Sequence, residues 1–307
     1  MEKPRGISDV YFNALIDHLE NLSYRDRLNF LRDRVTPRLD RFLYKFRSLV
    51  PSEAKSVERM RDILVRCRLR LSSPAEFNDP FDMSANIVVR GKPSEIRRRV
   101  DKILEGQGIR WAQRKKRIAE IMSRSDPEGA FLKTQETFEK TIAGTGVCSF
   151  AGDPLSILMW SHYAANHEGV CLQFELARDP RTFAQALPVD YNDDYPVVNW
   201  LAGMDDTTPL LRKHTGWKYE RERRIIIPES AGTFIDFRPT ALSGIITGYR
   251  ASDLTVKRLR DLLTERLSSG FPLPKLYRAI KHKGKYRLLL KKEGMGSVVR
   301  VRLNSVF

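Results

Sequence analysis

Residues 146–174, GVCSFAGDPLSILMWSHYAANHEGVCLQF, carry the pattern that decides the fold. Two short runs in this stretch, 146–150 and 169–174, are rich in valine, cysteine and phenylalanine and predict strands. The segment between them predicts a polar loop followed by a helix that ends near Tyr163. Many short strand candidates and scattered helices surround this unit, so the sequence predicts an α+β fold and not a regular alternation of strand and helix.

The rest of the chain divides by composition. Residues 1–41 predict an N-terminal helical extension, and residues 42–307 predict one domain. Within that domain, the strongly charged stretch 92–140 has helical spacing and predicts a helical insertion, whereas 252–307 forms a basic C-terminal part. Further helices are predicted at 51–68 and 252–269, and further strands at 42–49, 69–74, 186–191, 222–227, 233–237, 243–248, 275–281, 285–291 and 297–303.

Composition narrows the class of protein. Hydrophobic residues make up 41% of the 307 residues, and the chain contains no apolar run of about 18 residues and no charged-then-apolar leader. We therefore expect no membrane partner and a cytoplasmic location. Cys67, Cys148 and Cys171 lack metal-site spacing and have apolar neighbours, which predicts buried, reduced thiols.

The charge is strongly positive and unevenly distributed. The formal net charge is +16, and between residues 275 and 302 ten lysines and arginines accompany the single acid Glu293. A basic stripe of this kind attracts polyanions by neutralising phosphates and releasing counterions. We expect nucleic-acid contacts here; the alternative is an ordinary solubilising surface. The residues predicted to make these contacts are Lys281, Lys283, Lys285 and Arg287.

Paired carboxylates precede an aliphatic run in the stretch 217–227, WKYERERRIII. On a strand, Glu220 and Glu222 would point to the same face, and their like charges would raise the pKa of at least one of them. This face would line a cleft if the strand lies at a site. The alternative is a solvated edge strand with alternating charges.

Aromatic and histidine residues of the central unit offer further candidates. Trp160 and Tyr163 share one face of the expected helix, where they either pack onto the sheet or leave Tyr163 as a wall of a slot for a flat ring. His162 and His167 would lie about 140° apart around a helix, so they are poor mutual metal ligands. Phosphate-binding glycine motifs are absent, and we expect no metal site.

Five stretches together resemble a known family. These stretches are Leu43–Leu49, Phe77–Asp82, Val147–Phe150, Met159–Gly169 and Trp217–Arg224. Their combination resembles a bacterial family classed as a domain of unknown function, which includes AbiGi-like abortive-infection proteins. That family in turn is similar to divergent ADP-ribosyltransferases. The resemblance spans roughly residues 42–250.

The resemblance implies a split mixed β-sheet core and a site that uses NAD as co-substrate. It implies that Tyr163 stacks on nicotinamide and that Glu222, or else Glu220, is the catalytic glutamate. A carboxylate near the ribose would stabilise the positive charge that develops as the nicotinamide bond breaks, as in glycoside cleavage. The residues expected to bind NAD are Tyr44, Lys45, Arg47, Ser149, Phe150, Trp160 and His167.

The leading hypothesis is therefore an NAD-dependent ADP-ribosyltransferase-like effector that modifies nucleic acid, in phage defence or as a toxin, with an antitoxin or chaperone as a further partner. A second hypothesis is a non-catalytic, basic nucleic-acid-binding protein. A third is a metal-independent nuclease that uses Glu222, His167 and nearby basic residues.

Overall fold

The computed structural model describes residues 9–33, 40–123, 127–202 and 207–294. Its α-helices are α1 (Asp9–Asn21), α2 (Tyr24–Asp33), α3 (Ala54–Leu64), α4 (Pro93–Gly106), α5 (Trp111–Ser123), α6 (Pro127–Ala143), α7 (Ile157–Tyr163), α8 (Pro180–Phe183), α9 (Thr208–Leu211) and α10 (Asp253–Ser268). Short 3₁₀ helices are η1 (Pro74–Glu76), η2 (Leu176–Arg178), η3 (Trp200–Ala202), η4 (Thr215–Glu220) and η5 (Pro239–Ala241).

The strands form two sheets of more than two strands and three small pairs. Their bounds are β1 (Phe42–Arg47), β2 (Arg68–Arg70), β3 (Asn86–Val88), β4 (Gly146–Phe150), β5 (Val170–Glu175), β6 (Leu187–Pro188), β7 (Asp190–Tyr191), β8 (Val197–Asn199), β9 (Arg212–Lys213), β10 (Arg223–Ile227), β11 (Phe234–Asp236), β12 (Leu242–Thr247), β13 (Lys275–Lys281) and β14 (Leu288–Glu293). The five-stranded sheet has the order β1-β5-β12-β13-β14, and the three-stranded sheet has the order β4-β10-β6.

The five-stranded sheet is mixed, as the family resemblance implies. Strands β12 and β13 pair in parallel, whereas its other neighbours are antiparallel. A parallel pair needs a crossover connection, and α10 supplies it. This helix begins at the N-cap Ser252, whose side chain accepts a hydrogen bond from the Thr255 amide.

The two larger sheets meet at one backbone bridge. Tyr44 in β1 and Ala151, directly after β4, exchange two backbone hydrogen bonds of 3.0 and 2.7 Å. Beyond Tyr44, β1 continues along β5 and not along β4. Side chains of β1 and β4 therefore face a common space where the two sheets separate.

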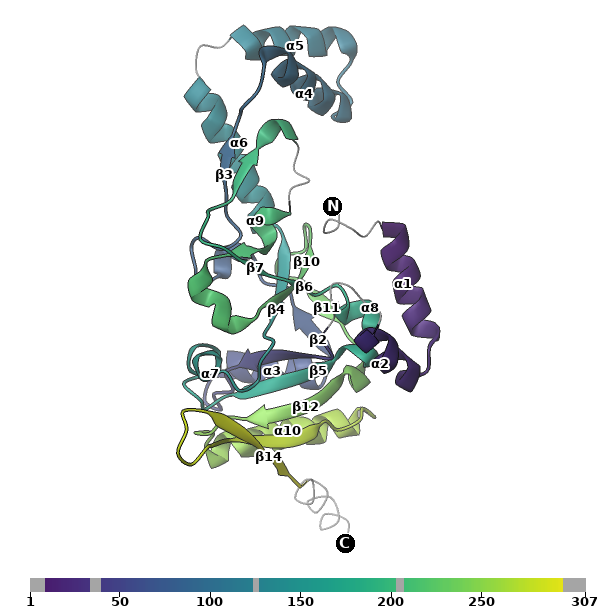
Figure 1. The fold of residues 1–307 in the computed structure, drawn as a ribbon, viewed down its shortest axis with the longest axis vertical. Helices are drawn as coiled ribbons and strands as arrows, with labels where there is room; N and C mark the ends of the chain where they lie inside the picture. The colour runs from purple at the N-terminus through teal and green to yellow at the C-terminus, as the bar shows by residue number, and fades with distance from the viewer. Residues whose placement is uncertain (1–8, 34–39, 124–126, 203–206, 295–307) are drawn as a thin grey trace.

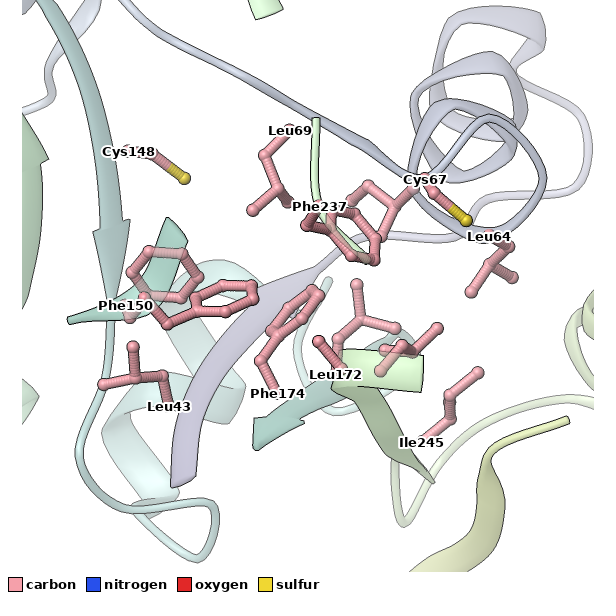
Figure 2. Close-up of a cluster of buried hydrophobic side chains, with 14 of the residues drawn as sticks. Leu43, Leu64, Cys67, Leu69, Cys148, Phe150, Leu172, Phe174, Phe237 and Ile245 are labelled. Carbon is pink, nitrogen blue, oxygen red and sulfur yellow. The ribbon is translucent and has the colours of Figure 1, made fainter. Parts of the chain in front are cut away.

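The main hydrophobic core joins both sheets to the helices. Figure 2 shows Phe150 of β4, Phe174 of β5 and Phe237 packed together, and the Phe174 ring meets the other two nearly edge-on at centroid distances of 5.9 and 5.2 Å. Cys67 and Cys148 are buried in this core, and Cys171 is buried beside α7. The predicted burial of all three thiols is confirmed.

The N-terminal helices belong to the same core. Ile16 and Leu19 of α1 and Leu31 of α2 are buried in it. The buried guanidinium of Arg27 donates to the backbone oxygens of Leu19, Glu20, Leu22 and Ala177. The expected boundary at residue 41 thus separates two segments that share one core.

The helical insertion lies at the opposite end of the molecule from the five-stranded sheet. Figure 1 shows α4 and α5 at one end of the long axis and β12–β14 near the other. The α4–α5 pair has a small core of its own, formed by Val100, Leu104 and Ile118. The predicted helical character of 92–140 is confirmed, except that 124–126 lie outside the described residues, as does the strand expected at 297–303.

Candidate functional site

A polar pocket of about 350 Å³ lies where the two larger sheets separate. The strands β1 and β4, the helix α7 and the segment from β9 to Glu222 supply most of its wall. Most of the residues predicted for the NAD site and its glutamates are found here: Tyr44, Lys45, Arg47, Ser149, Phe150, Tyr163, Glu220 and Glu222.

A buried network of charges forms one wall of this pocket. Lys213 Nζ lies 2.7 Å from Glu220, 3.1 Å from Glu222 and 3.3 Å from Asp82. Arg224, which is fully buried, binds Glu222 through two nitrogens at 2.8 and 2.9 Å and Asp82 at 2.6 Å. Two cations thus offset most of the charge of three carboxylates away from water, where such groups need good geometry to remain charged.

The two glutamates reach this network by a different local structure from the one predicted. Glu220 is the last residue of η4, Arg221 has left-handed backbone angles of 47° and 50°, and β10 begins only at Arg223. The prediction that the pair lies on one strand is therefore wrong. The left-handed Arg221 interrupts the extended chain between the two glutamates. Their carboxylates nevertheless lie close together, because both bind Lys213.

The environments of the two carboxyl groups push their pKa values apart. Burial raises the pKa of Glu220, and the nearby Glu222 adds to this rise while Lys213 opposes it. Burial also disfavours the charge on Glu222, but Arg224, Lys213 and a Ser149 hydrogen bond outweigh it and lower the pKa of Glu222 to about 2. Glu222 is therefore a fixed negative charge, whereas Glu220 is the group suited to exchange a proton.

Tyr163 connects α7 to Glu220. Its hydroxyl donates a hydrogen bond of 2.7 Å to Glu220 Oε1, while Asn78 approaches the same hydroxyl at 3.4 Å. Burial, together with the neighbouring Glu220, raises the pKa of Tyr163. The phenol therefore stays protonated at neutral pH and orients the carboxyl group.

Two cations from β1 line the pocket without a carboxylate partner among the described residues. Lys45 Nζ donates to the Ser149 carbonyl at 2.8 Å and lies 3.4 Å from Cys148 Sγ. Burial lowers the pKa of Lys45 to about 8, and burial also lowers the pKa of Arg47. The Arg47 Nε atom is buried and has no hydrogen-bond partner among the described residues.

Two predicted site residues lie elsewhere. Trp160 is fully buried, packs edge-on against Phe46 and donates its indole N–H to the Pro154 carbonyl, so its ring builds the fold. His167 follows α7 and lines a second pocket near the β13–β14 hairpin. Because Glu222 and His167 line different pockets, the geometry does not support the nuclease hypothesis.

The four cations predicted to contact nucleic acid are exposed on the β13–β14 hairpin. Lys281 ends β13, Lys283 and Lys285 lie in the turn, and Arg287 directly precedes β14. None of the four lines the polar pocket. They form a separate surface, at the end of the molecule that carries the yellow hairpin in Figure 1.

Three members of the charge network were not predicted as site residues: Asp82, Lys213 and Arg224, of which Arg224 appeared only as the end of the motif 217–224. Asp82 belongs to the turn-rich motif 77–82, and its Oδ1 atom is buried without a partner among the described residues. Lys213 lies in the two-residue strand β9, which has no recognisable pattern. No sequence motif links Asp82 to Lys213, because 131 positions separate them. The one signal in the sequence was the carboxylate of Asp82 in the motif 77–82.

The fold and the site define an α+β protein with a mixed sheet and a polar, charge-lined pocket. The model of a family described as "Protein of unknown function (DUF2971)" matches residues 159–225. This segment includes Tyr163, Lys213 and both glutamates, but not the β1 cations. No curated protein and no solved structure matches the chain. Among the described residues, no helix is both long and apolar enough to span a membrane.

Proposed function

We propose that the protein is an NAD-dependent ADP-ribosyltransferase-like enzyme whose site is the polar pocket between the sheets. One observation carries this proposal. The buried Lys45 and the half-buried Arg47, which have no carboxylate partner among the described residues, share a pocket with a buried carboxylate network. A ligand that suits this pocket has an anionic part, which binds the cations, and a second part, which becomes positively charged and lies near the carboxylates. NAD combines both.

Unsatisfied atoms support a polar ligand. The buried Arg47 Nε is an N–H donor and Asp82 Oδ1 is an acceptor, and neither has a partner in the described chain. Leaving such a group unpaired costs about 1–3 kcal/mol, so a ligand that bonded to both would recover this energy. The volume of about 350 Å³ is at the small end of ligand pockets, which suits the nicotinamide riboside half and the pyrophosphate, with the adenosine end outside.

The proposed mechanism divides the work between the glutamates. In the first event the bond between ribose C1′ and the nicotinamide nitrogen breaks, and its electron pair leaves with neutral nicotinamide. An acceptor hydroxyl or amine then bonds to C1′, and its proton passes to the Glu220 carboxylate, which Tyr163 orients. Glu222 holds Lys213 and Arg224 in place, and those two cations cancel most of its field. The Glu220 carboxylate is therefore the group that faces the positive charge on the ribose before it accepts the proton. We therefore assign proton transfer to Glu220 and a positioning role to Glu222.

The test compares NAD binding with NAD cleavage. The purified protein is incubated with NAD and total RNA, DNA or lysate protein, and mass spectrometry measures released nicotinamide and added ADP-ribose. We expect Glu220→Gln to retain NAD binding and to lose about 10²–10⁴-fold in turnover, the range for a general base. Glu58→Gln, at an exposed carboxylate of α3, is the matched control.

A wild-type protein that neither binds NAD nor releases nicotinamide with any acceptor would contradict the proposal. Full turnover in a folded Glu220→Gln protein would instead remove Glu220 from the mechanism. A role in phage defence or as a toxin stays a prediction.

A further inference from the structure

A second pocket, of about 580 Å³, lies between the β13–β14 hairpin and the turn that follows α7. The hairpin contributes Lys281, Lys285, Tyr286 and Arg287, and the turn contributes His167. Helix α7 separates this pocket from the polar pocket, because Ile157 at its start faces the hairpin while Met159 and Tyr163 face the proposed NAD site. One helix diameter, about 10 Å, is therefore the scale of the separation.

The charge of this hairpin pocket has one sign. Arg250, Lys281, Lys285 and Arg287 line it, and no aspartate or glutamate in the described part of the chain does. Among the described residues none of these four cations takes part in an ion pair within 4.0 Å. Like charges held close together and left unpaired favour a bound polyanion, because each phosphate that they neutralise releases condensed counterions.

Aromatic rings accompany the cations. The side chain of Tyr286 at the tip of the hairpin is fully exposed, and Tyr249 is 38% exposed. Lys281 Nζ lies 4.6 Å from the centroid of the Tyr249 ring. An aromatic ring in water without a packing partner is a platform on which an unpaired base can stack, and stacking beside cations is the usual arrangement for single strands.

Strained backbone leads up to His167, which lines the pocket opposite the hairpin. Ala165, Asn166 and His167 are three successive non-glycine residues with positive φ, of 46°, 51° and 73°. Such conformations are uncommon and persist where the surrounding structure holds them, often at functional sites. Here Gly248 allows the close approach, since a Cβ atom there would lie 2.0 Å from the His167 carbonyl oxygen.

We propose that the hairpin pocket binds single-stranded nucleic acid, with its phosphates on Lys281, Lys285 and Arg287 and a base stacked on Tyr286. A concave pocket of this volume accommodates an unpaired base, which a duplex keeps inside its stack. The binding does not depend on NAD chemistry. If the proposed function also holds, the strand lies one helix away from the reacting ribose and is the acceptor.

The test measures fluorescence anisotropy of labelled 15-nucleotide oligouridine, oligothymidine and a 15-base-pair duplex over a range of salt concentrations. We expect the single strands to bind more tightly than the duplex, and the two single-stranded probes to distinguish RNA from DNA as the preferred ligand. Replacing Lys281, Lys285 and Arg287 by Gln should weaken binding at least tenfold and reduce the salt slope by about 2, at about 0.7 for each lost contact.

Two controls make the test specific. The triple change of Lys102, Lys116 and Arg117 to Gln removes the same charge from exposed positions of the helical insertion and should leave affinity within twofold. Tyr286→Ala should weaken binding roughly 5- to 160-fold, the range for one stacked base, whereas Tyr286→Phe should not. Because Tyr286 is fully exposed, neither change threatens folding.

Three results would overturn the proposal. The first is an equal loss of affinity for the single strands in the two triple variants, and the second is an unchanged affinity in Tyr286→Ala. The third is binding to phosphatidylserine vesicles that is tighter than binding to either single-stranded oligonucleotide and that depends on the same residues. None of them bears on NAD cleavage, so failure here is distinguishable from failure of the proposed function.

Discussion

Replacing Glu222 by Gln should destabilise the protein more than any change of an exposed carboxylate. The side chain of Glu222 is only 6% exposed and binds Arg224 and Lys213. Its pKa falls from 4.5 to about 2 in the folded protein, and at about 1.4 kcal/mol per pH unit this difference corresponds to about 3 kcal/mol. Breaking a buried ion pair by removing one partner costs about 3–5 kcal/mol, which agrees in size.

The assay is urea unfolding of the wild type and the variant at pH 7 and at lower pH. The ionised carboxylate stabilises the folded state above its unfolded pKa of about 4.5, so the difference between the proteins should shrink between pH 5 and pH 2. Glu58→Gln is the control, because Glu58 is half-exposed and its ion pairs with Arg61 and Arg66 are worth at most about 1 kcal/mol. A loss in Glu222→Gln no larger than in this control, or one that does not change with pH, would refute the reasoning.

Three further outcomes follow from the described contacts. Lys45→Met should weaken NAD binding, but it should raise the stability of the protein at pH 7, because burial disfavours the charged lysine and lowers its pKa to about 8. The wild type should therefore gain stability relative to the variant as the pH rises from about 8 to 10.5, which urea unfolding can check. Gly169→Ala should cost about 1–3 kcal/mol of stability in thermal melts, since its Cβ atom would lie 2.3 Å from a backbone oxygen of β1. Gly106→Ala is the control and should cost nothing in these melts, because its Cβ atom would meet nothing within 4 Å. Trp160→Phe should lose about 1–3 kcal/mol, because the smaller ring underfills a fully buried position and the part-buried Pro154 carbonyl loses its 2.8 Å donor. An unchanged melting temperature would contradict this.

Local patterns predicted much of the secondary structure. The strands at 146–150 and 275–281 have the predicted bounds, and α10 and β12 differ from prediction by one residue at each end. These segments have clear hydrophobic periodicity and recognisable ends. Predicted helix 51–68 extends too far, because α3 ends at Leu64 and Arg68 already belongs to β2, where it pairs with Asp236 of β11. No local pattern encodes this contact.

The site was predictable only in part, and for a physical reason. Tyr163, Arg47 and the glutamates stood out as motif residues, and they line one pocket. Lys213 could not be found, because its role comes from three carboxylates that packing brings within 3.3 Å. The main role moves from Glu222 to Glu220 for the same reason, since packing places Arg224 and Ser149 beside Glu222, where they lower its pKa.

The separate core of the helical insertion has a consequence for the order of folding. Val100, Leu104 and Ile118 pack mainly against residues between 96 and 122, with Trp200 as a more distant partner, and such local contacts form fast. The charge network needs Asp82 to meet residues more than 130 positions later, and closing so long a loop is slow. We therefore expect the insertion to acquire its structure early and the polar pocket to be among the last parts of the molecule to form.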